Sequence, residues 1–187
     1  MQKTRQKLLK SAHHLVAQEG FAGLQVARVA DHAGVATGTL YRHFPNKTAL
    51  CVEVYSRASE HEIRVLKENL EPEQAGSTLV ADRIAFALTV WCQRAHSAVT
   101  LARALLHEPV EPDVERVRIR YRREYAEIFE VTLAEGVASG ELPEQDVEVV
   151  SSCLVGALSE SVLGPAGPRM TPAIVRFCMS AIRPRST

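Results

Sequence analysis

The stretch that most constrains the fold runs from residue 33 to residue 47 and reads AGVATGTLYRHFPNK. Gly34 lacks a Cβ, so it can adopt the left-handed conformation that ends a helix. We expect Thr37 to cap the next helix through its hydroxyl. That helix must be short, because Phe44 and Pro45 close it. A helix, a tight turn and a short polar helix form the layout of a helix-turn-helix, which reads DNA.

The short helix carries an unusual density of hydrogen-bonding groups. Thr39, Tyr41, Arg42 and His43 lie within five residues. Leu40 is the inward anchor, and we expect Phe44 to seal the end of the helix against the core. The remaining side chains are predicted to face outward.

Charge is distributed unevenly along the chain. The 187 residues have a formal net charge of zero. Residues 1–47, however, contain seven lysines and arginines against two acidic residues, which leaves five positive charges there and five negative charges in the remainder. This asymmetry predicts a polyanionic partner for the first part alone. The sequence pI near 7.1 argues against indiscriminate coating of nucleic acid.

Apolar residues recur with helical spacing over most of the chain, and no convincing strand, hairpin or repeat interrupts them. The sequence therefore predicts an all-α fold of about nine helices, over residues 5–19, 26–33, 37–43, 47–70, 78–95, 97–108, 113–138, 143–162 and 172–182. Pro143 is expected to open the eighth helix, and Thr171 with Pro172 the last one.

Residues 71–77 are the best candidate linker. We therefore expect a DNA-binding domain over 1–47, a connecting helix over about 47–70, and a helical ligand-binding and dimerisation domain over 71–187. No apolar run reaches 18 residues and no signal-peptide pattern opens the chain, so a cytoplasmic protein is expected.

The four cysteines are far apart and form no CxxC pair, which favours reduced and mostly buried thiols. No metal-ligand spacing, glycine-rich phosphate loop or Ser/Cys–His–Asp arrangement is suggested. We therefore expect no cofactor, no metal and no enzymatic activity.

Residues 5–54 resemble the TetR family of bacterial transcriptional regulators. The matching features are Leu8-Leu9, Ala12, Gly20-Phe21, Val29-Ala30, Ala33-Gly34-Val35, Gly38 through Phe44, Asn46-Lys47 and Leu50. The resemblance implies a homodimeric repressor that a small molecule releases from DNA, without naming the molecule. One departure is Gln25, because the family commonly caps its second helix with Ser or Thr.

The resemblance also implies that Tyr41 and His43 hydrogen-bond DNA phosphates and that Lys47 pairs with one. Thr37, Thr39 and Arg42 are candidates for base edges, since Arg matches guanine O6 and N7, and Gly38 lets the backbone approach the duplex. At the second helix, the phosphate contact is assigned to Gln25, backbone amides or Arg28. Lys3 and Arg5 are expected to add contacts from a loose N-terminal arm. The alternatives are that Tyr41 packs, and that His43 and Arg42 only meet solvent.

A ligand pocket is expected in the later three quarters of the chain. Its candidates are aromatic residues and polar residues on otherwise apolar helices: Trp91, Cys92, His96, Arg103, His107, Tyr121, Tyr125 and Phe129. The alternatives are a plain core for the aromatic stripe, and satisfied or exposed side chains for the polar residues. The arginines between Arg116 and Arg123 are either a solvated helix face or, through Arg118 and Arg122, an attractor for an anionic inducer.

The last two helices are more apolar than a surface needs, which predicts a two-fold dimer contact. Its candidates are Val150, Leu154, Leu158, Val162, Ile174, Phe177 and Cys178, and the alternative is burial within one chain. A dimer predicts a palindromic operator. The competing hypothesis is a helical DNA-binding regulator controlled by a protein partner or acting without a small ligand.

Overall fold

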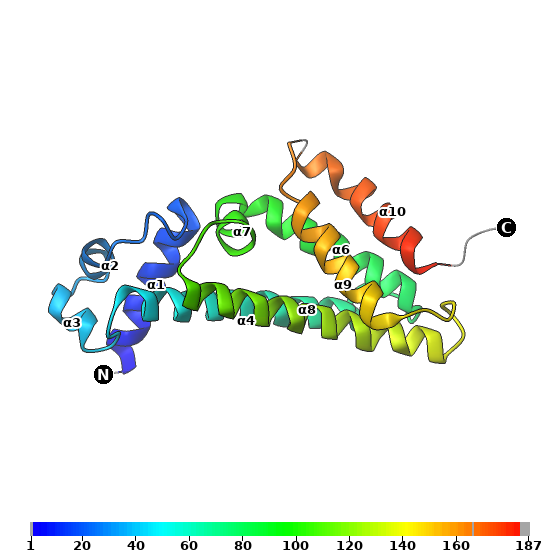
Figure 1. Cartoon of the computed structure of the whole chain (residues 1–187), viewed down its shortest axis with the longest axis horizontal. Coiled ribbons are helices and arrows are strands. Elements are labelled where there is room, and N and C mark those ends of the chain that lie inside the picture. Colours follow the sequence, from blue (N-terminus) through cyan, green and yellow to red (C-terminus); the bar gives the residue numbers. More distant parts are fainter. Residues whose placement is uncertain (1, 166, 184–187) are drawn as a thin grey trace. The chain divides into compact units, whose positions relative to one another are not determined.

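The computed structural model describes residues 2–165 and 167–183, and the regular elements in this part of the chain are all helices (Figure 1). Its elements are α1 (Gln2–Glu19), α2 (Val26–His32), α3 (Thr37–Tyr41), α4 (Lys47–Leu70), α5 (Pro72–Ala75), α6 (Val80–Ser97), α7 (Val99–Leu106), α8 (Pro112–Ala138), α9 (Val147–Ser161), the 3-10 helix η1 (Gly167–Met170) and α10 (Thr171–Ile182). The predicted all-α class is confirmed. None of the helices in the described residues has the length and apolar character needed to cross a membrane.

Most predicted helix bounds are correct to within two or three residues, but several helix starts differ. The helix expected from Pro143 begins at Val147, because Asp146 caps it by accepting the Val149 N–H at 3.1 Å. Thr171 is the first residue of α10 and makes no capping bond. The expected linker contains a single helical turn, α5, which ends at Ala75 with Gly76 as its C-cap.

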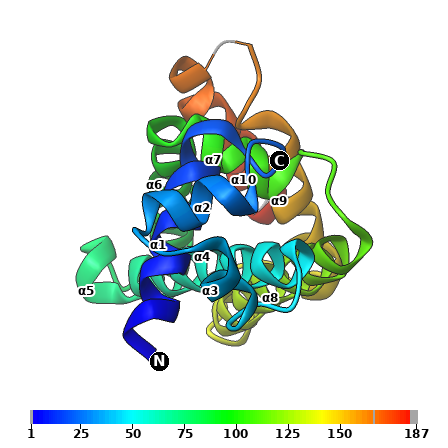
Figure 2. The same ribbon diagram turned by 90° about the vertical axis from the view of Figure 1, so that its left-hand side faces the viewer.

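The chain forms two compact units, and the first comprises Met1–His61 with Ala98–Arg120. Within it, α1 packs against α2 and α7, and α2 packs against α3. Figure 2 shows these helices from the side that carries α2 and α3. The core of this unit consists of fully covered apolar side chains, among them Leu8, Val16, Val29, Leu40 and Leu50.

Arg118 holds the later segment of this unit together. Only 6% exposed, it donates to the carbonyl oxygens of Leu105 at 2.9 Å, Ala104 at 3.2 Å and Glu108 at 2.7 Å. The carboxylate of Glu115 is a fourth acceptor, at 2.6 Å. Arg118 therefore satisfies the carbonyls at the C-terminal end of α7, which have no partner within that helix.

The second unit comprises Glu62–Ser97 with Tyr121–Thr187. Here α10 packs against α6 and α9, around buried residues such as Ile84, Leu88 and Ile182. The buried Arg83 donates at 2.6 Å to the carbonyl of Leu70 and at 2.6 Å to the carboxylate of Glu135. Arg83 thus finds its partners within the same chain, as burial requires, whereas the buried Oε1 of Gln145 in this unit has no hydrogen-bond partner among the described residues.

Candidate nucleic-acid interface

The reading helix α3 is held by its apolar side. Leu40 is fully buried and Phe44 is 2% exposed, so both act as the predicted anchors. Gly34 adopts φ +68° in the turn before the helix, as predicted, and a side chain there would be strained. The helix is therefore fixed to the core although it is only five residues long.

The opposite side of α3 presents polar groups to solvent. Tyr41 is 51% exposed, and Thr37 and Arg42 are exposed. Thr39 and His43 are half-buried, and the Thr39 hydroxyl accepts a bond from Arg42 at 3.2 Å. Thr37 does not cap the helix, because Ala36 occupies the N-cap position and no side-chain cap forms. The Thr37 hydroxyl remains available to another molecule.

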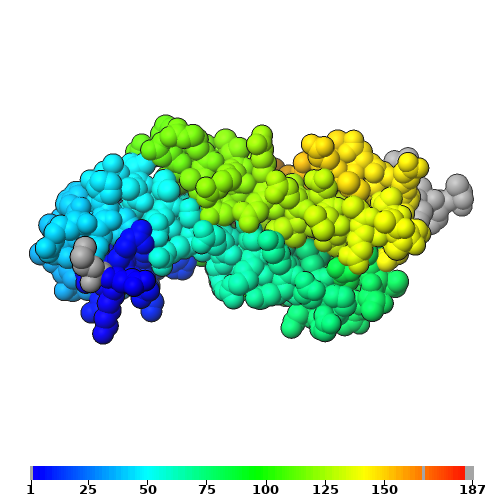
Figure 3. Space-filling view, turned by 90° about the horizontal axis from the view of Figure 1, so that it is seen from below, coloured from blue at the N-terminus to red at the C-terminus, as the bar shows by residue number. Residues whose placement is uncertain are grey.

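The start of α4 adds positive character beside this helix. Lys47 is the exposed first residue of a helix of 24 residues, whose N-terminus carries a partial positive charge. Asn46 caps α4, since its side-chain oxygen accepts the Ala49 N–H at 2.8 Å. This cap was not predicted, although Asn directly before a helical pattern is an ordinary start signal. The space-filling view shows the light-blue α3 and the start of α4 at the molecular surface (Figure 3).

The two side chains considered for a phosphate contact at α2 differ in whether they are already paired. Arg28 forms a two-pronged ion pair with Glu19, with N–O distances of 2.5 and 2.6 Å, and this pair lowers the pKa of the Glu19 carboxyl. Gln25 is the N-cap residue of α2 but makes no capping bond, so its exposed amide stays free. Of the alternatives at this helix, Gln25 is therefore better placed than Arg28.

The loose N-terminal arm is a wrong prediction. Helix α1 begins at Gln2, and Arg5 donates at 2.9 Å to the carboxylate of Glu53. The Arg5 guanidinium also lies over the Phe44 ring, 5.0 Å from its centroid. The hydrogen bond from Arg5 lowers the pKa of the Glu53 carboxyl, and the stacking braces the end of the reading helix. Lys3 lies on the same helix and is exposed.

Glu108, which no sequence motif singles out, joins distant parts of the first unit. Its carboxylate accepts the backbone N–H groups of Phe21 at 2.9 Å and Ala22 at 2.6 Å, in the turn between α1 and α2. A Cβ on Gly20 would lie 2.5 Å from this carboxylate, so glycine makes the approach possible. Because the two partners are 86 and 87 residues from Glu108, no local pattern reveals the contact.

The predicted ligand residues are divided between the units. Arg103 and His107 lie in the first unit, and the other six lie in the second, where Cys92, Tyr121 and Phe129 are buried and Trp91 and Tyr125 are half-buried. Both ring nitrogens of His96 are engaged: Nε2 lies 2.8 Å from the Val162 carbonyl oxygen, and Nδ1 lies 3.4 Å from the Thr171 hydroxyl. His96 therefore matches the alternative of a satisfied side chain. Arg118 is likewise used internally, which removes it from the hypothesis of an anionic ligand.

Most of the predicted dimer residues are covered by their own chain. Leu154, Leu158, Val162, Ile174 and Cys178 are at most 5% exposed, so these five belong to the core of the second unit. The prediction was wrong for these residues because an apolar helix face can be buried either by other helices of the same chain or by a second copy of the protein, and the sequence pattern is the same in both cases. Val150 is half-buried, and Phe177 is 67% exposed.

The cysteines are free thiols in the described residues, with Cys153 exposed and the other three buried. Burial raises the pKa of Cys92 and of Cys178 to about 11, which keeps both protonated. Within the described part of the chain, no group of three or more His, Cys, Asp or Glu side chains could hold a metal ion.

Comparison with known proteins identifies the arrangement of α1 to α4. Residues 8–54 match the family model of bacterial regulatory proteins of the tetR family. The helix-turn-helix part of the chain is therefore of the TetR type, and the chain is similar to regulators of this family. It is a DNA-binding transcriptional regulator and not an enzyme.

Two relatives match the chain to different extents. The fatty acid metabolism regulator protein of Bacillus subtilis (strain 168) is 25% identical over 158 residues, which cover 83% of this chain and 80% of that protein. An HTH-type transcriptional regulator of Staphylococcus aureus (strain USA300) is 42% identical over 53 residues, covering 28% of this chain and 29% of that protein. The second match is confined to a segment about as long as the DNA-binding part.

Solved structures extend the likeness to nearly the whole chain at the level of fold. FadR from Bacillus subtilis in complex with stearoyl-CoA has a TM-score of 0.78 and 20% identity, covering 95% of this chain and 99% of that one. Reduced NemR from E. coli has a TM-score of 0.78 and 19% identity, covering 98% and 100%. RolR in complex with resorcinol has a TM-score of 0.68 and 20% identity, covering 97% and 88%.

Proposed function

We propose that this protein is a cytoplasmic repressor that binds a palindromic operator as a homodimer and leaves it when a small-molecule inducer binds in residues 71–187. The proposal rests on the polar face that α3 and the start of α4 present over a closed core. In the described residues, Gln25, Thr37, Tyr41, His43 and Lys47 have no side-chain hydrogen bond or ion pair within the chain. Polar groups held in place but left unpaired are suited to an external partner.

The roles on DNA follow from the chemistry of these groups. Arg42 is proposed to read guanine, with Thr37 and Thr39 on neighbouring base edges. Tyr41, His43 and Lys47 are proposed to hold phosphates, which position the protein without reading sequence. Gln25 takes the phosphate contact at α2, because Arg28 is engaged with Glu19. Gly38 lets the backbone come close, since a Cβ there would meet nothing within 4 Å in the protein itself.

A single short helix reads too few bases for specificity, so the operator must be bound by two copies. We propose that the exposed faces of α9 and α10, which pack against each other, form the dimer contact. Phe177 is 67% and Val149 is 55% exposed there, and the small residues Ala173 and Ala181 lie four residues either side of Phe177, both exposed. A large aromatic side chain among small neighbours suits a self-complementary surface.

An inducer would act by favouring a conformation whose two reading helices no longer fit adjacent major grooves. Two neighbours in fold were solved as complexes with stearoyl-CoA and with resorcinol, which supports a small-molecule ligand for this chain as well.

DNA binding is tested with the DNA that flanks the gene of this protein. Fluorescence anisotropy should find an inverted repeat bound with high affinity and two-fold stoichiometry, and a scrambled repeat should bind more weakly by about a thousandfold or more. Equal affinity for both sequences would contradict a sequence-specific repressor. If the operator is specific but no compound from a metabolite library releases it, the alternative of a protein-controlled or ligand-free regulator gains support.

The dimer is tested by Phe177→Glu, which places a charge in the proposed contact. Light scattering should then report a monomer where the parent is a dimer. Val131→Glu is the matched control, because Val131 is 72% exposed on α8 and lies outside the proposed contact. A Phe177→Glu variant that remains dimeric would exclude this surface.

A further inference from the structure

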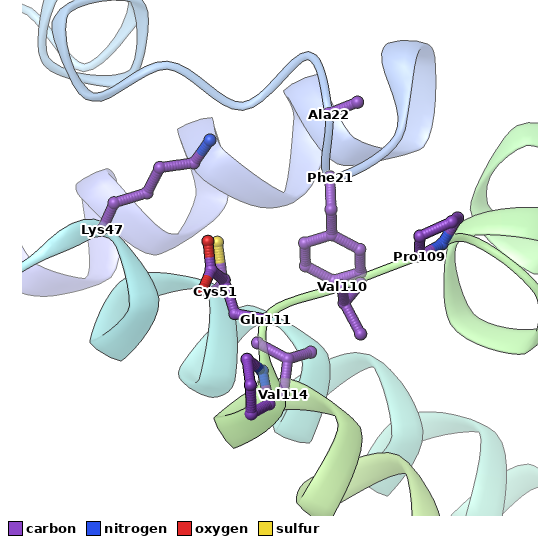
Figure 4. Close-up of a pocket in the computed structure, with 9 residues that line it drawn as sticks. Phe21, Ala22, Lys47, Cys51, Pro109, Val110, Glu111 and Val114 are labelled. Atoms are coloured by element: carbon purple, nitrogen blue, oxygen red, sulfur yellow. The ribbon is translucent and has the colours of Figure 1, made fainter.

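A hollow of about 400 Å³ lies inside the first unit, close to the DNA-facing surface (Figure 4). Its lining residues are Phe21, Ala22, Lys47, Cys51, Pro109, Val110, Glu111, Pro112 and Val114. This volume falls in the range of about 300–1,000 Å³ that small-molecule sites occupy. None of the eight residues predicted for the inducer pocket lines it, so it is a different site.

The walls of the hollow are held in place by the contacts described above. Glu108 joins the segment that carries Pro109 and Val110 to the turn at Phe21 and Ala22. Arg118 fixes the backbone at Glu108 from the other side. The hollow is therefore part of a hydrogen-bonded framework, and it does not depend on loose side chains.

The inner surface of the hollow is mostly apolar. Phe21, Cys51 and Val114 are at most 5% exposed, and Val110 is half-buried. In the view of Figure 4, the Phe21 ring and Val110 lie toward one side and Lys47 toward the other. Burial raises the pKa of the Cys51 thiol, so Cys51 contributes a neutral and weakly polar surface.

Two opposite charges border this apolar surface. Lys47 and Glu111 both line the hollow and are both exposed, yet in the described residues neither has an ion-pair or hydrogen-bond partner through its side chain. They are therefore not neutralising each other by direct contact. A ligand with one group of each sign would satisfy both, and the positive N-terminus of α4 adds to the attraction at the anionic end.

We propose that this hollow binds a small zwitterion with a compact apolar body, of the kind an apolar α-amino acid represents. Its carboxylate pairs with Lys47, its ammonium pairs with Glu111, and its side chain lies on Phe21, Val110 and Val114. The effect on DNA rests on the proposed function, because Lys47 is also the proposed phosphate contact. A ligand that engages Lys47 competes with the phosphate and weakens operator binding.

Binding is tested on the full chain without DNA, by titration calorimetry with L-valine, L-leucine and L-phenylalanine. At least one should bind. For L-leucine, the matched probes are 4-methylpentanoate, which lacks the ammonium group, and 3-methylbutylamine, which lacks the carboxylate. Each should bind about tenfold more weakly or worse, which corresponds to about 1.4 kcal/mol for the charge pair that the probe cannot form. No binding by any amino acid, or equal binding by the carboxylate alone, would overturn the proposal.

Variants then locate the site. Glu111→Gln should weaken amino-acid binding and leave the affinity for the amine-free carboxylate unchanged, whereas Glu144→Gln, at an exposed glutamate outside the hollow, should change neither. If Glu111→Gln binds the amino acid as the parent does, the site lies elsewhere. Operator binding measured with and without the amino acid is a separate readout. Absence of amino-acid binding with intact operator binding contradicts this inference alone, whereas failure to bind any operator contradicts the proposed function.

Discussion

Several polar side chains on the DNA-facing surface lack hydrogen-bond partners within the described chain, whereas Arg83 and His96 in the second unit have them. On α3 and at the start of α4, groups such as Tyr41 and Lys47 are held by a buried apolar framework and find no partner within the described chain. In the second unit, Arg83 and His96 have their polar atoms engaged by neighbouring carbonyl, carboxylate or hydroxyl groups. The contrast teaches that a polar residue on a helix indicates function only when its own chain leaves it unsatisfied.

The largest effects are expected when an arginine is replaced by methionine in each of the two regions, at Arg83 in the second unit and at Arg42 on the DNA-facing surface. Arg83→Met should lower the free energy of unfolding by about 2 kcal/mol, chiefly because it leaves the buried Leu70 carbonyl without a donor. The lost ion pair adds less, since the Glu135 side chain is 53% exposed. Arg42→Met should leave the free energy of unfolding within about 0.5 kcal/mol of the parent and weaken operator binding by about 1–3 kcal/mol. Urea unfolding and fluorescence anisotropy measure the two quantities. A stable Arg83→Met variant, or an unstable Arg42→Met variant, would break the distinction.

Gly38→Ala adds a single Cβ atom and should affect DNA binding without lowering the stability of the fold. A Cβ there meets nothing within 4 Å in the protein, and alanine favours a helix over glycine by about 0.5–1 kcal/mol. The variant should therefore melt at the same temperature or higher, while its operator affinity falls about tenfold, or 1.4 kcal/mol, because the Cβ enters the space left for the duplex. Thermal unfolding with anisotropy decides the matter. Unchanged affinity would show that the duplex does not approach this residue.

Lys47→Met tests whether Lys47 contacts a DNA phosphate, as proposed, or a base. It should weaken operator and scrambled DNA by similar factors and reduce the slope of log K against log salt by about one, as expected when a single Lys–phosphate pair is removed. Lys67→Met is the control, because Lys67 is an exposed lysine on the same helix outside the proposed interface. Anisotropy over a salt series gives the slope. A selective weakening for the operator alone would instead place Lys47 at a base.

The smallest effect concerns the Arg5–Glu53 pair behind the reading helix. Hydrogen bonding from Arg5 lowers the pKa of Glu53, so the pair stabilises the fold above the carboxyl's unfolded pKa of about 4.3. This stabilisation disappears as pH falls through the folded pKa. Glu53→Gln should therefore cost about 0.5 kcal/mol at pH 7 and close to nothing at pH 3.

Glu73→Gln is the matched control for that measurement, since Glu73 is an exposed glutamate in α5 outside the first unit. Urea unfolding at pH 7, 5 and 3 should show no pH-dependent difference for it. A Glu53→Gln cost that stays constant across this pH range would contradict an electrostatic origin.

Prediction from sequence succeeded where local rules apply. Helical periodicity located α4, and Gly34 and Leu40 have the backbone and burial expected of them. It failed where the deciding partner is far away in sequence. Arg5 was expected on DNA but meets Glu53, and Glu108 was overlooked because its partners at Phe21 and Ala22 lie in another part of the chain.

By itself, the sequence determined that the chain is helical, where the turn before the reading helix falls, and that the reading helix carries polar groups around an apolar anchor. These follow from backbone preferences and from the 3.6-residue period, which act within a few residues. Only the tertiary structure decided which polar side chains remain unpaired, because pairing depends on which segments burial brings together. It separated Arg118, whose guanidinium binds its own chain's carbonyls, from Lys47, whose ammonium is free to bind another molecule.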